Sequence, residues 1–231
     1  MIDLRHVAET GSTNDDVSAL AAAGAAEGLW LRADQQSGGR GRQGRAWRSP
    51  GGNLYASTLV RLQPGDPMAP TLALVAATAL HEVAGAYAGG DRVRLKWPND
   101  LLAGNAKLAG ILLERAGGAV VIGFGVNLAH HPADLERPAL SLAALTGTAP
   151  DPGLFCRELA EAFARWLDRW RTLGLAPVRA AWLAAAHPLG TLLSTSVGEG
   201  RFEGLDETGA LRLRTQDGVL RTIHAGDVFL V

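Results

Sequence analysis

Lysine is nearly absent from this chain. The 231 residues include twenty arginines but two lysines, and these two, Lys96 and Lys107, fall within one short stretch. An ammonium group is a compact point charge that can approach one oxygen in a narrow pocket, whereas a guanidinium is a broad planar fork. A lysine retained among arginines therefore indicates a position that needs a point charge. Chance proximity is the competing explanation, and the pair alone does not decide between the two.

Cysteine is rarer still, and a targeting segment is missing. The single cysteine excludes an internal disulfide framework, which fits the reducing cytoplasm. Residues 1–9 are charged and lack the apolar core of a signal peptide. The most apolar stretch, residues 69–88, is rich in alanine and is interrupted by His81 and Glu82, so it predicts a buried helix. We therefore expect a cytoplasmic protein that does not contact a membrane.

Acidic residues are missing from one segment of an otherwise balanced chain. The formal net charge is −1 and the pI is about 6.6, yet residues 35–65 contain no aspartate or glutamate. Glycine and arginine alternate within residues 39–45, where glycines admit close backbone N–H contacts and arginines can clamp carboxylate or phosphate oxygens. A loop that binds nucleic acid loosely is the alternative. Nucleic-acid-binding domains are usually basic overall, so the pattern favours a small anion.

The composition of residues 36–52 also indicates a mobile loop. Its glycines make residues 36–52 costly to order, and its arginines repel one another unless an anion lies among them. We therefore expect a mobile loop that closes over a bound anion.

Length and patterning predict an α+β protein, with a mixed sheet flanked by helices. A chain of this length with 47% hydrophobic residues can bury a sizeable core. Hairpin turns are expected at residues 104–105 and 117–118. Helices are expected from residue 12 to about 24, over 68–88 and over 155–170. Strands are expected at residues 4–9, 29–34, 53–62, 93–97, 101–102, 106–114 and 119–128.

The end of the chain differs in character. After residue 187 the sequence has short β runs separated by turns at residues 190, 198–200, 206–209, 217–218 and 225–227. Turns spaced in this way suggest a small barrel, which is too short to be stable without packing on the rest of the protein. We therefore predict a main domain at residues 1–186 and a C-terminal barrel at residues 187–231.

Four segments, in this order along the chain, resemble the biotin protein ligases (biotin–[acetyl-CoA carboxylase] ligases). They are Ser12-Thr13-Asn14, Gln36 followed by Gly39 through Trp47, Lys96 through Leu101 with Lys107 through Gly110, and Gly123 through Leu128. The tail ending in Ala225-Gly226-Asp227-Val228 is similar to the SH3-like barrel of that family. The resemblance thus spans essentially the whole chain.

This resemblance implies a fold and an activity. The fold is that of the class II synthetase-like biotin and lipoate ligases, with a small C-terminal SH3-like β-barrel. The activity is the joining of biotin to ATP with Mg²⁺, which yields biotinyl-5′-AMP. Biotin is then transferred to a lysine of a biotin carboxyl carrier protein or of the carrier domain of a biotin-dependent carboxylase.

The resemblance also implies roles for particular residues. For biotin these are Ser12, Thr13, Asn14, Gln36, Gly39, Arg40, Gly41, Lys107 and Gly110. For ATP they are Arg40, Arg42, Arg45, Trp47, Asn99 and Asn127. Lys107, Arg42 and Asp100 are the implied catalytic residues, and Asp100 is also a candidate for Mg²⁺, through ATP, or for the incoming lysine. The chemistry agrees, because a neutral cyclic urea needs hydroxyl and amide partners, whereas two anions that must meet need positive charge.

Departures and alternatives remain. Family members that repress their own operon carry an N-terminal helix-turn-helix, whereas here the Ser-Thr-Asn motif begins at residue 12, so we expect a monofunctional enzyme that binds no DNA. Arg48 stands where an aromatic residue is common in the family. A lipoate or octanoate protein ligase or transferase is the nearest alternative, and a non-enzymatic nucleic-acid-binding module is an alternative of another class. The oligomeric state stays open, with a homodimer among the options.

Overall fold

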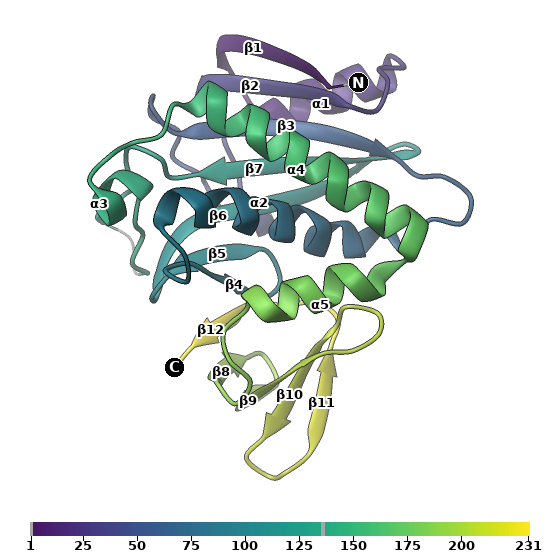
Figure 1. Cartoon of the computed structure of the whole chain (residues 1–231), viewed down its shortest axis with the longest axis vertical. Helices are drawn as coiled ribbons and strands as arrows, with labels where there is room; N and C mark the ends of the chain where they lie inside the picture. The colour runs from purple at the N-terminus through teal and green to yellow at the C-terminus, as the bar shows by residue number, and fades with distance from the viewer. Residues whose placement is uncertain (1, 135–136) are drawn as a thin grey trace.

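Two β-sheets organise the protein. The computed structural model describes residues 2–134 and 137–231 (Figure 1). The large sheet has seven strands in the order β1-β2-β3-β7-β6-β5-β4, and the small sheet has five in the order β11-β10-β9-β8-β12. The large sheet is mixed, because β1 and β2 run parallel while the remaining neighbours are antiparallel. Its strands are β1 (Asp3–Thr10), β2 (Leu29–Gln36), β3 (Leu54–Arg61), β4 (Arg94–Lys96), β5 (Asp100–Ala103), β6 (Ala106–Ala116) and β7 (Ala119–Val126).

Helices cover both faces of the large sheet. Figure 1 shows α2 and α4 lying across the face turned towards the viewer, and α5 between that layer and the small sheet. On the opposite face, Val17 of α1 packs against Leu59 of β3 and Val121 of β7. The helices are α1 (Thr13–Ala22), α2 (Leu72–Ala88), α3 (Leu142–Thr146), α4 (Pro152–Leu173) and α5 (Leu175–Ala185), with 3₁₀ turns η1 (Arg42–Gly44) and η2 (Ala69–Thr71).

The long apolar segment is a core helix. Residues 69–88 are long and apolar enough to cross a membrane by length and composition alone, yet 67% of the most apolar window is buried inside the protein. Leu72, Val75, Ala79 and Leu80 of this segment are fully inaccessible and belong to the main core. The expectation of a buried helix is confirmed.

In the small sheet, one turn lies at a different position from the one predicted. It consists of β8 (Leu192–Thr195), β9 (Gly198–Leu205), β10 (Leu211–Thr215), β11 (Leu220–Ile223) and β12 (Val228–Leu230). The turn expected at residues 198–200 is wrong, because the chain turns at residues 196–197 and β9 begins at Gly198. Gly200 instead allows close approach of two strands, since a Cβ there would lie 2.5 Å from the carbonyl oxygen of Arg214 on β10.

Two helices were not expected from the sequence. Gly174 ends α4 with a φ of 75°, and the chain continues directly into α5. The segment of α5 is short and carries a single charged residue, Arg179, so its periodicity is weak. α3 has only five residues and begins at Ser141, whose hydroxyl accepts a hydrogen bond from the backbone N–H of Ala144.

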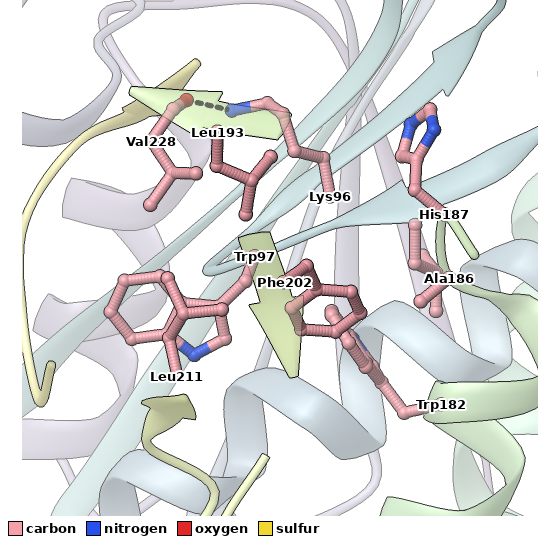
Figure 2. Close-up of a pocket in the computed structure, with 10 residues that line it drawn as sticks. Lys96, Trp97, Trp182, Ala186, His187, Leu193, Phe202, Leu211 and Val228 are labelled. Carbon is pink, nitrogen blue, oxygen red and sulfur yellow. Dashed lines mark hydrogen bonds between the residues drawn. The ribbon is translucent and has the colours of Figure 1, made fainter. Parts of the chain in front are cut away.

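The two sheets meet at β4. Leu95 forms a parallel bridge with Ala186, and the indole Nε1 of Trp97 donates to the carbonyl oxygen of Gly209 over 3.1 Å. Figure 2 shows the ring of Trp97 beside Phe202 and Leu211 of the small sheet. A cavity of only about 20 Å³ lies at this joint, and its lining is apolar apart from Lys96 and His187. A division into domains at residues 186 and 187 stays a prediction, supported by the position of this joint.

Candidate active site

Glycines hollow out the α1 face of the large sheet. Successive side chains on a strand point to opposite faces, so Gly123 and Gly125 share the face of Val121 beneath α1. Gly110 of β6 lies directly opposite Gly125. A Cβ at Gly125 would lie 2.7 Å from Cε2 of Trp47, so only glycine lets that indole lie against the strand. The result is a cavity of about 690 Å³.

The cavity brings together nearly all of the residues proposed from the sequence. Its lining includes Ser12, Thr13, Asn14, Gln36, Arg40, Gly41, Arg42, Arg45, Trp47, Asn99, Asp100, Lys107, Gly110 and Asn127. Gly39 is not part of the lining. A Cβ at Gly39 would lie 2.7 Å from both Ser49 Oγ and the Trp47 carbonyl oxygen, and its own carbonyl accepts the Trp47 N–H. Gly39 therefore lets the loop pack closely on itself.

One end of the cavity carries uncharged polar groups. Gln36 Oε1 accepts from the backbone N–H and the hydroxyl of Thr13 over 2.9 and 3.1 Å. The Thr13 hydroxyl also lies 2.7 Å from Ser57 Oγ, which donates to Asn14 Oδ1 over 2.7 Å. Ser12 takes the N-cap position of α1 as expected, but among the described residues its side chain makes no capping hydrogen bond. These hydroxyl and amide groups can serve a neutral polar ring.

The other end holds both lysines on one carboxylate. Lys107 Nζ lies 2.5 Å from Asp100 Oδ1, and Lys96 Nζ lies 2.9 Å from Asp100 Oδ2. Burial by itself would raise the pKa of Asp100, but the two ammonium groups outweigh burial, and the net pKa lies below its usual value. Two cations on one anion leave a single positive charge at this point of the cavity.

The backbone of Lys107 is fixed on both sides. Its N–H donates to the carbonyl oxygen of Pro138 over 2.8 Å, and its own carbonyl accepts from Leu140 over 3.0 Å. The side-chain amide of Asn127 donates to the carbonyl oxygens of Lys107 and Leu140, both at 3.3 Å. Asn127 thus supports the strand that carries Lys107, and a contact with adenine stays a prediction.

Asn99 has a similar supporting position. Its Nδ2 donates to the carbonyl oxygen of Ile111 on β6 over 2.6 Å, and its Oδ1 accepts from Arg42 Nη1 over 3.3 Å. The amide therefore links the arginine loop to the sheet, and its contact with adenine also stays a prediction.

Each arginine of the loop has a carboxylate partner. Hydrogen bonds with Asp15 are the main reason that the pKa of Arg40 is raised, and Glu114 adds to the effect. The pairs are Arg40 with Asp15 at 2.5 Å and with Glu114 at 3.1 Å, Arg42 with Asp227 at 3.6 Å, Arg45 with Asp227, and Arg48 with Asp134 at 2.6 Å. Carboxylates from outside the loop are therefore the anions that lie among these arginines, and closure of the loop over a ligand stays a prediction.

Trp47 covers the glycine floor. Its ring centroid lies 5.5 Å from Lys107 Nζ, within reach of a cation–π interaction. Its indole Nε1 is buried and has no hydrogen-bond partner in the part of the chain that the structure describes. A buried donor without a partner is uncommon, and here it lines the cavity.

Comparison with known families gives a direct match to both parts of the chain. Residues 12–127 match the biotin/lipoate A/B protein ligase family, and residues 191–231 match the biotin protein ligase C-terminal domain. A biotin–[acetyl-CoA-carboxylase] ligase from Paracoccus denitrificans is 42% identical over 96% of this chain and 98% of its own length. The chain belongs to the biotin/lipoate A/B protein ligase family.

Solved structures of family members share the fold. The biotin protein ligase from Aquifex aeolicus in complex with biotin and ATP superposes with a TM-score of 0.89 at 24% identity, over all of both chains. The Leishmania major enzyme in complex with biotinyl-5-AMP gives a TM-score of 0.68 at 25% identity, over 96% of this chain and 99% of its own. The likeness extends through the small sheet, which is consistent with the expected SH3-like fold.

Sequence reasoning missed three residues that line the cavity of this family member, and it missed Glu114, which contacts the lining residues Asn14 and Arg40. Glu114 lies two residues beyond Leu112 on the cavity face of β6, so strand alternation could have identified it. Phe229 of β12 and Asp227, which directly precedes that strand, also line the cavity. Arg137 stacks its guanidinium 3.5 Å from the ring centroid of Phe229. No sequence signal places the C-terminal strand against a loop near residue 42.

The residues present offer no protein cage for Mg²⁺. Across residues 2–134 and 137–231, no three His, Cys, Asp or Glu side chains are grouped as metal ligands would be. Both oxygens of Asp100 are paired with ammonium groups. Mg²⁺ often binds enzymes through substrate phosphates and water with few protein ligands, so this donor set fits a metal that arrives with ATP. A direct role for Asp100 as a metal ligand stays a prediction.

Proposed function

We propose that this chain is an ATP-dependent biotin protein ligase. One observation carries the proposal: a single cavity has hydroxyl and amide groups at one end and a surplus positive charge at the other. Thr13 and Gln36 define the first end, and Lys107 with Arg42 defines the second. A ligand with a neutral ureido ring and an anionic chain end matches both. Gly110, Gly123 and Gly125 leave room for it between the two ends.

The first step is adenylation. An oxygen of the biotin carboxylate attacks the α-phosphorus of ATP, a new P–O bond forms, and diphosphate leaves with the electrons of the broken bond. Negative charge gathers where the two anions meet, and fixed cations aimed at that point stabilise the transition state. Lys107 and Arg42 supply those cations from β6 and η1. Mg²⁺ bound to the phosphates would add further positive charge.

The second step is transfer. The neutral amine of a carrier lysine attacks the acyl carbon of biotinyl-5′-AMP, an amide bond forms, the bond between the acyl carbon and the phosphate oxygen breaks, AMP leaves with its electrons, and the amine proton passes to solvent. Asp100 is the candidate that receives the incoming lysine, because its pKa is lowered and it stays ionised at neutral pH. Its contact with Lys107, the residue proposed to bind the biotin carboxylate, supports this role.

The partner is proposed to be the carrier domain of a biotin-dependent carboxylase. The Paracoccus denitrificans relative is named for acetyl-CoA carboxylase, which supports this assignment. A lipoate or octanoate ligase has the same family membership, but a plain acyl chain has no polar ring to contact the hydroxyl and amide end of the cavity. A nucleic-acid-binding module is disfavoured because the chain as a whole carries a formal net charge of −1, whereas nucleic-acid-binding domains are usually basic.

Mass spectrometry tests the proposal directly. The protein is incubated with biotin and MgATP, and biotinyl-5′-AMP is the expected product, with lipoate as the competing substrate in a parallel reaction. Lys107→Ala provides the control for a contaminating ligase. Absence of biotinyl-5′-AMP, or preferential formation of lipoyl-AMP, would overturn the assignment to biotin.

A further inference from the structure

The two lysines of this protein take part in one continuous series of polar contacts. The ammonium of Lys96 donates to the carbonyl oxygen of Val228 on β12 over 2.7 Å (Figure 2). The same ammonium pairs with Asp100 Oδ2, and Asp100 Oδ1 pairs with Lys107. Lys96 therefore contacts the small sheet and Asp100, and Asp100 in turn contacts Lys107. Sequence reasoning assigned a role to Lys107 alone.

Burial makes Lys96 unusual for a lysine. Its side chain is 11% exposed, whereas that of Lys107 is 35% exposed and faces the cavity. Burial is the main influence on the pKa of Lys96 and lowers it, while Asp100 favours the charged form. A buried ammonium is costly unless its partners are well placed, so this position is unfavourable for a lysine that serves only as packing.

The charge balance shows what Lys96 contributes. With Lys96 present, the three groups carry one surplus positive charge, and one oxygen of Asp100 is occupied by a cation other than Lys107. Without Lys96, Asp100 and Lys107 would form a neutral pair. The ammonium of Lys107 would then be held by the whole charge of Asp100, and less of its field would reach a substrate anion.

We propose that Lys96 is a positioning residue for adenylation, which acts by holding Asp100 so that Asp100 orients Lys107 without cancelling its charge. The inference rests on the proposed function and deepens it. Lys96 also joins this arrangement to the small sheet, because Val228 belongs to β12, which pairs with β8. The preceding Gly226 accepts a hydrogen bond from Arg42 over 3.0 Å. The short segment 226–228, at the start of β12, thus accepts hydrogen bonds from both Arg42 and Lys96.

A double-mutant cycle between Lys96 and Asp100 tests the inference. We expect Lys96→Met to lower kcat for biotinyl-5′-AMP formation about 10- to 100-fold, the scale for removing a residue that orients a reactive group. In an Asp100→Asn background the same substitution should change kcat less than about 3-fold, because Asp100 then has no charge to be balanced. Adenylation is measured alone, without a carrier protein, and rates are normalised to the number of biotin-binding sites.

A matched control lies on the same strand. Arg94 is also a cation of β4, but it pairs with Asp91 and is not part of the cavity lining. Arg94→Met should leave kcat for adenylation within about 2-fold of wild type, as expected of a surface ion pair.

The double-mutant cycle still tests the role of Lys96 if one variant does not fold. If Lys96→Met is unstable, the comparison of Asp100→Asn with the double variant Lys96→Met/Asp100→Asn remains, because the double variant has neither of the two buried charges and the number of biotin-binding sites gives the folded fraction of each variant. Equal losses of kcat in both backgrounds, or a large loss in the Asp100→Asn background, would show that Lys96 does not act through Asp100. A wild-type protein that forms no biotinyl-5′-AMP would instead overturn the proposed function itself.

Discussion

The side-chain amide of Asn14 donates to Glu114 Oε2 over 2.6 Å, and so ties the first turn of α1 to the far end of β6. The same carboxylate accepts from the guanidinium of Arg40 over 3.1 and 3.2 Å. Glu114 therefore connects the uncharged end of the cavity to the arginine loop. A ligand that contacts Asn14 or Arg40 is therefore bound by residues that are linked to each other through Glu114.

Glu114→Gln should weaken biotin binding more than it slows chemistry. The amide keeps an acceptor for Asn14 but removes the charge that pairs with Arg40, which leaves Arg40 held by Asp15 alone. We expect KM for biotin to rise by about 10-fold with kcat little changed, because a contact made equally in the ground and transition states affects KM. Steady-state adenylation kinetics measure both constants. A fall in kcat at constant KM would contradict this role.

Lys107→Ala should reduce biotinyl-5′-AMP formation by about 10²–10³-fold, the scale for removing one preorganised transition-state contact. Lys107→Arg should restore little, because a planar fork does not reproduce a point contact with Asp100. Single-turnover formation of the adenylate measures both variants. Arg115→Ala, an exposed residue of the same strand, is the control. Near-normal adenylation by Lys107→Arg would show that this position does not require the point charge of a lysine.

Asp227→Asn should loosen the arginine loop. Asp227 pairs with Arg45 and lies 3.6 Å from Arg42, and it is the carboxylate that the small sheet brings to the loop. We expect faster cleavage by trypsin after Arg42 and Arg45 and a higher KM for ATP, since the loop is ordered less of the time. Asp217→Asn provides the control, because Asp217 pairs with Thr215 and Arg221 within the small sheet. Identical cleavage rates in wild type and Asp227→Asn would show that other contacts order the loop.

The Asp100 cluster should contribute a pH-dependent part of the stability. The pKa of Asp100 in the folded protein lies below the ordinary value of 3.8, because the lysines outweigh burial. A group with a lowered folded pKa stabilises the fold above its unfolded pKa, and this contribution is lost as pH falls through the folded pKa. The free energy of unfolding at about pH 6 should therefore be larger for wild type than for Asp100→Asn. This difference, the stability gap, should become smaller below about pH 4. Urea unfolding at several pH values measures the gap, and a constant gap would contradict the assignment.

Local patterns in the sequence were sufficient for most of the large sheet. Side-chain alternation and turn glycines define the hairpins from β5 to β7, since both depend on residues close in sequence. The same reasoning failed at Gly200, where the glycine serves contact with Arg214 on a neighbouring strand rather than a turn. Nothing within residues 198–200 distinguishes these two uses of glycine.

The motif residues were also identifiable before the fold was known, since their types suit a ureido ring and two anions. Their electrostatic state was not. Arg40 is neutralised by Glu114 and Arg45 by Asp227, residues 74 and 182 positions away along the chain. Likewise, Lys96 reaches a carbonyl group 132 positions later. The order of residues along the chain shows which groups the protein has for its chemistry. The carboxylates that balance those groups are known only from the fold, because these pairs form where two sheets and a loop pack together.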